Sequence, residues 1–223
     1  MKLNSKRIKI ISTGEYKYLF TRPDFDDNER QHYFSLNESE IKQTNGYSLS
    51  SAVYFVLQLG YFKAKSQFFS VKIKQVREDV KFIQSCLQKE LRIIKSFPSD
   101  TMQRNIQQHI LAFVKYFGDM DDIKQDLQPK AKQQARISHK PEEMFRELIR
   151  FVEHKRFVRP GYTVFQDTIS NAISNENNRL YKIIDTRLPK YIRNDLNDIL
   201  SVDEDFYRLT RSEEHTSELQ SRQ

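Results

Sequence analysis

The sequence predicts an all-α protein made of two small helical modules of the helix-turn-helix type. Only 5 glycines and 6 prolines interrupt the 223 residues, and charged and aliphatic residues dominate between them. Apolar residues recur there at spacings of three and four, the period of a helix with one buried face. Aromatic residues make up 12% of the chain, more than a disordered polypeptide carries, so we expect a packed core.

The first module is expected over residues 1–97. Asn37, followed three residues later by Glu40, has the pattern of a capping box and predicts a helix start. The most apolar stretch predicts a buried central helix, and Gly60 is expected to mark its end. The predicted helices are residues 12–20, residues 26–33, the one capped by Asn37, residues 48–62 and residues 75–91.

The second module is expected over residues 98–210, after a boundary at Pro98. Gly118 is expected to close its first helix, and the polar segment 121–138 is expected to carry little core. Thr163 and Gln166 have capping-box spacing. The predicted helices are residues 101–117, residues 141–157, one that starts at Thr163 and continues past Asn175 to residue 188, and one from Pro189 to Leu200. Residues 211–223 are interpreted as a translated sequencing adapter and are left out of the fold.

The composition excludes several classes of protein. The single cysteine, Cys86, cannot form an internal disulfide or a zinc site of paired cysteines, which fits a reduced cytoplasmic compartment. No apolar run approaches the roughly 20 residues of a membrane helix. The acidic cluster at Asp119, Asp121 and Asp122 lacks the glycine and final glutamate of a calcium loop. We therefore expect no catalytic residues, metal, cofactor, membrane contact or small-molecule substrate.

The positive charge is clustered, which favours a nucleic-acid partner. The net charge is +7 and the pI about 9.3. Residues 61–95 hold 9 Lys/Arg against 3 Asp/Glu, and residues 130–159 hold 9 against 4. Such clusters suit contacts to DNA phosphates, although solvated helix faces would give the same pattern. The candidate phosphate contacts are Lys63, Lys65, Lys72, Lys74, Arg77, Lys155, Arg156 and Arg159.

A helix, a short turn containing Gly161 and a capped helix together form a helix-turn-helix pattern. In such units the first residues of the second helix reach base edges in the major groove, where Gln and Asn can pair with adenine. A plain helical hairpin with a polar outer face would give the same pattern. The candidate base-reading residues are Tyr162, Thr163, Gln166 and Asn171.

Several strings, in order, resemble the N-terminal region of the Tn-three family of replicative transposases. They are Tyr33–Leu36, Val53–Lys65, Phe68–Phe69, Val76–Val80, Phe145–Leu148, Pro160–Asp167 and Tyr207–Thr210. The resemblance covers nearly all of residues 1–210. It implies a helical region that binds double-stranded DNA at the terminal inverted repeats of the transposon.

In that family a later domain cuts and joins DNA with two Asp, one Glu and magnesium, so we expect a DNA-associated, non-catalytic fragment. One alternative is a helical interaction module for transposase self-association, with a homodimer as its signature. The other is an independent enzyme, which would require a convergent polar cluster in a pocket.

Overall fold

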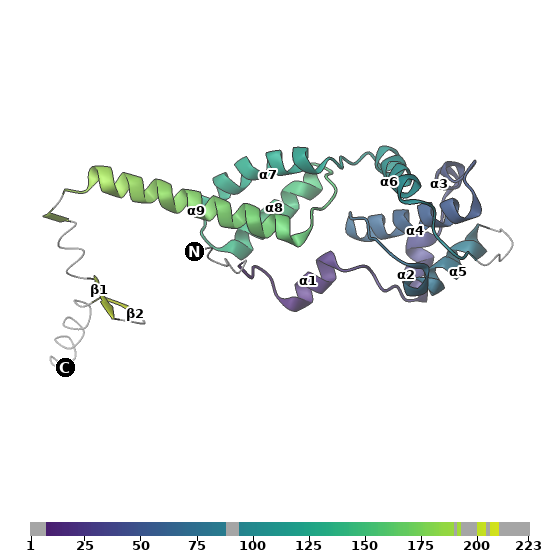
Figure 1. The fold of residues 1–223 in the computed structure, drawn as a ribbon, viewed down its shortest axis with the longest axis horizontal. Coiled ribbons are helices and arrows are strands. Elements are labelled where there is room, and N and C mark those ends of the chain that lie inside the picture. The colour runs from purple at the N-terminus through teal and green to yellow at the C-terminus, as the bar shows by residue number, and fades with distance from the viewer. Residues whose placement is uncertain (1–7, 88–93, 190, 193–199, 204–205, 210–223) are drawn as a thin grey trace. The chain divides into compact units, whose positions relative to one another are not determined.

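The computed structural model describes residues 8–87, 94–189, 191–192, 200–203 and 206–209, and it confirms the all-α fold class (Figure 1). A short antiparallel hairpin, in which Leu200 pairs with Leu209, is the exception among these residues. The chain divides into two compact units, residues 1–173 and residues 174–223. The elements are α1 (Thr13–Phe20), α2 (Asp27–Phe34), α3 (Glu38–Gln43), α4 (Leu49–Lys65), the 3-10 turn η1 (Ile73–Gln75), α5 (Arg77–Cys86), α6 (Asp100–Val114), α7 (Met120–Ala135), α8 (Pro141–His154), α9 (Tyr162–Arg187), β1 (Leu200–Asp203) and β2 (Phe206–Leu209).

Helix α4 is the central buried helix that the sequence predicts. Every residue from Ser51 to Phe62 is buried. Gly60 does not end the helix, however, which continues to Lys65 and is closed by Ser66 at φ 52°. The glycine instead allows a close approach, because a Cβ at position 60 would lie 2.4 Å from the ring of Phe34.

One hydrophobic core surrounds α4 and includes residues of α2, α5 and α6. The helix predicted over residues 75–91 is shorter than expected. It begins at Arg77, after η1, and ends at Cys86, and residues 88–91 lie outside the described residues. Ile106 and Ile110 of α6 belong to this same core, although they follow Pro98. The module boundary at Pro98 stays a prediction.

A second core joins α1, α7, α8 and α9. Segment 121–138 contributes more to it than predicted, because α7 buries Ile123, Leu127, Ala131 and Ala135 at a spacing of four. Two of these four buried residues are alanines, so the mean hydropathy of the segment is low and did not indicate its amphipathic pattern.

The end of α6 also differs from the prediction. The helix stops at Val114, Lys115 takes the left-handed conformation at φ 58°, and Phe117 lies beyond the helix with 65% of its surface exposed. Gly118 therefore does not close the helix. A Cβ there would lie 2.4 Å from Leu111 Cδ1, so glycine serves close packing.

Helix α9 is one continuous helix past Asn175, as expected. The last predicted helix is not confirmed: Leu200 lies in β1, and residues 193–199 lie outside the described part of the chain. The interpretation of residues 211–223 as an adapter-derived tail also falls on residues outside the description. None of the described helices has the length and apolar character needed to span a membrane.

Candidate nucleic-acid interface

The first turn of α9 holds the segment of residues 8–11 at the start of the described chain. The Tyr162 hydroxyl accepts hydrogen bonds from the Ile10 amide at 2.9 Å and the Ile11 amide at 3.4 Å. Ile10 and Ile11 are both buried. Two of the predicted base-reading positions are thus occupied by internal contacts, because Gln166, which is 7% exposed, donates from Nε2 to the Ile8 carbonyl at 2.6 Å.

The predicted capping box at Thr163 does not form, because α9 begins one residue earlier, at Tyr162. Thr163 and Asn171 are exposed and lie eight residues apart, so they share one solvent-facing side of the helix. These two predicted base-reading residues remain accessible from outside.

The connection between α8 and α9 spans residues 155–161 and is longer than the tight turn the sequence suggests. Lys155 and Arg156 are exposed. The Arg156 guanidinium donates to the Val114 carbonyl at 3.0 Å and lies 5.2 Å from the ring centre of Tyr116. Arg156 therefore fastens the end of α8 to the end of α6 while one side of its guanidinium stays accessible.

Arg159, by contrast, is buried. Its guanidinium donates to Glu153 at 3.1 Å and to the Leu19 carbonyl at 3.3 Å, and its backbone amide donates to the Ser66 carbonyl at 2.8 Å. Its Nε has no partner among the described residues. These contacts give Arg159 a place in the internal packing, and its role as a phosphate contact stays a prediction.

Two of the five basic residues predicted in the first positive region have internal partners. Lys63 Nζ forms an ion pair with Glu40 at 2.8 Å. Lys65 donates to the Tyr18 carbonyl and lies 4.3 Å from the centre of that tyrosine ring. Burial, and then the nearby charge of Arg159, lowers the pKa of the Lys65 ammonium. Both lysines stand in the last turn of α4, where a positive charge also stabilises the helix dipole.

The other three basic residues, Lys72, Lys74 and Arg77, are exposed and form no ion pair with any described residue. Lys74 and Arg77 line a cavity of about 310 Å³ at the start of α5. Arg22 and Arg30, which the sequence analysis did not single out, also line it.

A buried carboxylate organises this cavity. Asp79, which is 3% exposed, accepts hydrogen bonds from the Tyr61 hydroxyl at 2.6 Å and from Arg30 Nε at 2.8 Å. Arg22 Nη1 lies 3.8 Å from Asp79 Oδ2, the oxygen that Tyr61 contacts, and donates to the Tyr61 hydroxyl at 3.3 Å. Burial, reinforced by the hydrogen bond to Asp79, raises the pKa of the Tyr61 phenol far above its usual range.

The sequence held one signal for this network. Asp79 lies between Val76 and Val80 on the buried side of a predicted amphipathic helix. A buried carboxylate requires cationic or hydrogen-bonding partners, but the sequence does not say which. The structure supplies Tyr61, which belongs to another of the strings quoted above, and Arg22 and Arg30, which lie outside those strings.

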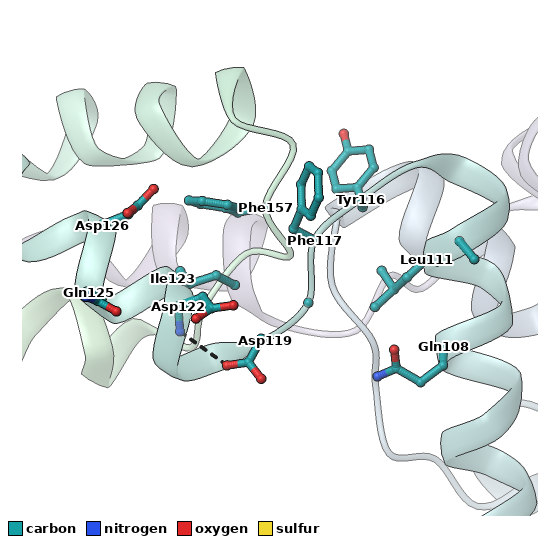
Figure 2. A pocket seen from close by; sticks show the side chains of 12 residues that line it. Gln108, Leu111, Tyr116, Phe117, Asp119, Asp122, Ile123, Gln125, Asp126 and Phe157 are labelled. Carbon is teal, nitrogen blue, oxygen red and sulfur yellow. Dashed lines mark hydrogen bonds between the residues drawn. The ribbon is translucent and has the colours of Figure 1, made fainter.

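A larger cavity, of about 510 Å³, lies between α6 and the first turns of α7 (Figure 2). Phe117 and Phe157 line it beside the carboxylates of Asp119, Asp122 and Asp126. Asp119 is the N-cap of α7, accepting from the amides of Asp121 and Asp122. The negative charge of this cavity opposes phosphate binding. Within the described residues, no three acidic, histidine or cysteine side chains could jointly hold a metal ion.

Comparison with known proteins places the chain in a family by its sequence. No curated protein matches it, and no solved structure matches it. A family model described as a domain of unknown function (DUF4158) matches residues 10–172. Because that match covers well over half of the 223 residues, the chain belongs to the DUF4158 family.

Proposed function

We propose that this chain is the N-terminal DNA-binding region of a replicative transposase of the Tn-three type, and that it binds the terminal inverted repeats of its transposon. Its family is found in transposase-related proteins, which supports the broader part of the proposal. The order of the resembling strings supports the narrower part. In this proposal the chain binds DNA and leaves strand cleavage to another part of the transposase.

The observation that carries DNA binding is a set of exposed cationic side chains. Of the eight predicted phosphate contacts, five are exposed and form no ion pair with the residues that the structure describes. Exposed, unpaired cations are the groups that release counterions when they meet DNA phosphates. They are Lys72, Lys74, Arg77, Lys155 and Arg156.

Base reading is proposed for the exposed side of α9. Asn171 can pair with adenine, and Thr163 can contact a base or a phosphate. Tyr162 and Gln166 could read bases only if residues 8–11 left their site. Exposing Ile10 and Ile11 would cost roughly 1.5–3 kcal/mol for each side chain, before the hydrogen bonds are counted. We therefore place Tyr162 and Gln166 in a supporting role.

The test is binding of the full chain to its inverted repeat and to a scrambled duplex over a salt series. If each of these five cations meets its own phosphate, log K should fall with log salt at a slope of about −4.5, and if two of them share one phosphate the slope should be about −3.6. Asn171→Ala should weaken repeat binding by about 5- to 150-fold, the equivalent of about 1–3 kcal/mol, and should relax one base preference. Asn105→Ala, the same change on the exposed side of α6, is the control. Equal affinity for both duplexes at every salt concentration would refute sequence-specific recognition.

A second candidate, self-association, is favoured by apolar side chains exposed near the C-terminal end of the described helices. They are Leu180, Tyr181, Ile184 and Tyr191. Such side chains suit a protein partner better than a DNA phosphate. Sedimentation across a concentration series decides this candidate. A dimer whose DNA affinity does not exceed that of other proteins of similar charge would favour it.

A further inference from the structure

The cavity at the start of α5 has the charge distribution of an oxyanion site. Asp79 is paired with Arg30 at 2.8 Å. Glu78 points to a different partner, Lys81, whose Nζ lies 3.0 Å away. The lining carries four cations, Arg22, Arg30, Lys74 and Arg77, against three carboxylates, Asp24, Glu78 and Asp79. Arg22 and Arg30 both pair with Asp79, so Lys74 and Arg77 are the lining cations that form no ion pair with a described residue. A ligand there would meet an excess of positive charge.

The cations are held at different depths. Arg22 is partly buried and is fixed by its bonds to the Pro23 carbonyl at 2.9 Å and to the Tyr61 hydroxyl at 3.3 Å. Lys74 and Arg77 are exposed at the rim and can close on a ligand from outside. One partly buried guanidinium and two exposed cations suit a group with several charged oxygens.

The backbone of α5 adds donors to the same place. The residue at its N-cap position, Val76, has no side chain able to accept a hydrogen bond. The amides of the first turn, Arg77 to Asp79, thus lack the side-chain cap that most helices of this chain have. These amides favour an anion next to the rim cations, in addition to the carboxylates of Glu78 and Asp79 that the first turn of the helix already carries.

We propose that this cavity, lined by Arg22, Lys74 and Arg77, binds one phosphodiester group of the DNA backbone. Asp79 and Tyr61 act as positioning residues that hold the guanidinium groups in place. A backbone phosphate fits better than a free nucleotide, because the lining contains one apolar side chain, Val76, and no aromatic ring on which a base could stack. The proposal rests on DNA binding as the function of the chain.

A single shared phosphate makes a quantitative prediction. The double variant Lys74→Gln with Arg77→Gln should lower the salt slope by about 0.9 and each single variant by no more than that, because one shared phosphate contact can be lost only once. Two independent contacts would instead lower the slope of the double variant by about 1.8. The expected loss of affinity at 0.1 M salt is about eightfold, the contribution of one such contact relative to 1 M salt.

The matched control is Lys42→Gln with Lys132→Gln. Both lysines are exposed on helices and form no ion pair with the described residues, so the charge removed is the same. All variants change exposed side chains, and unchanged thermal unfolding would verify that each is folded. The control should keep the wild-type salt slope.

A DNA-side variant sharpens the test. Replacing single backbone phosphates by neutral methylphosphonates should reveal one position that weakens wild-type binding about eightfold and leaves the double variant unaffected. A wild-type slope in the double variant, or equal sensitivity of both proteins at every position, would overturn the proposal.

Inorganic phosphate separates this proposal from the proposed function. In the absence of DNA it should shift the NMR signals of the Arg77–Asp79 amides in the wild type and not in the double variant. If the signals of these amides shift but the chain binds no duplex better than other proteins of similar charge do, the proposed function is refuted and the oxyanion site is supported. If they do not shift and the slope is unchanged, the site itself is refuted.

Discussion

The hydrogen bond between Tyr61 and Asp79 offers the sharpest test of how the fold supports the cavity. Tyr61→Phe removes one hydroxyl from a fully buried ring and adds no volume. Asp79 then loses its 2.6 Å donor, and Arg22 loses its acceptor at 3.3 Å. A buried hydrogen bond to a charged group contributes about 1.5–3 kcal/mol, so we expect the free energy of unfolding to fall by that amount. For a chain of this size the melting temperature should fall by about 3–12 °C.

Urea unfolding followed by far-UV circular dichroism measures this change. Tyr18→Phe is the matched control, because that ring is 73% exposed and its hydroxyl has no partner among the described residues. A Tyr61→Phe variant within about 0.5 kcal/mol of Tyr18→Phe, the range of ordinary surface substitutions, would contradict the network.

The pH dependence of the same variant gives a second result. Because burial raises the pKa of Tyr61 in the folded state, the unfolded chain releases this proton first, from the ordinary value of 10.0 upward. The stability that this shift contributes is fully present below pH 10 and is lost as the pH rises above it. The stability difference between wild type and Tyr61→Phe should therefore shrink above pH 10, and a constant difference would exclude this cause.

Three further substitutions test the packing by urea unfolding. Gly60→Ala should destabilise by about 1–3 kcal/mol, since its Cβ would lie 2.4 Å from the Phe34 ring, whereas Gly14→Ala has its nearest neighbour at 3.9 Å and should not destabilise. Lys115→Gly should stabilise by about 1 kcal/mol, because glycine adopts φ 58° without strain; a loss of stability would contradict this. Leu127→Ala should cost about 2–5 kcal/mol, and a cost below 1 kcal/mol would show that α7 is not part of the core.

Local sequence signals predicted the capping box at Asn37 correctly, but they failed at Thr163 and at two helix ends. Asn37 and Glu40 form the expected reciprocal capping box, since both partners are three residues apart and require no distant contact. The ends of α4 and α6 were wrong because Ser66 and Lys115 occupy left-handed positions where glycine is the usual signal. Gly60 and Gly118, the residues expected at those ends, serve close packing instead.

At the candidate site the sequence predicted the charge but not its partners. Lys63 belongs to a basic cluster by sequence, yet it is paired with Glu40 from another helix. Gln166 has the spacing of a capping residue, yet its amide is bound to the Ile8 carbonyl, 158 residues away. Neither contact follows from a periodic pattern, because both depend on how separate helices pack. The cavity arginines were missed for the same reason: Arg22 and Arg30 gain their place through Asp79, which is distant in sequence.

The contact between residues 8–11 and α9 also sets an order of events while the chain is being synthesised. The core around α4 has all its buried residues once Ile110 has left the ribosome. Ile10, in contrast, must wait for Tyr162, 152 residues later, before its amide finds an acceptor. Such distant pairings form late in folding. The family match begins at residue 10 and ends within α9, so it includes both partners of this contact. A nascent chain halted before α9 would lack the hydroxyl that accepts from the Ile10 and Ile11 amides.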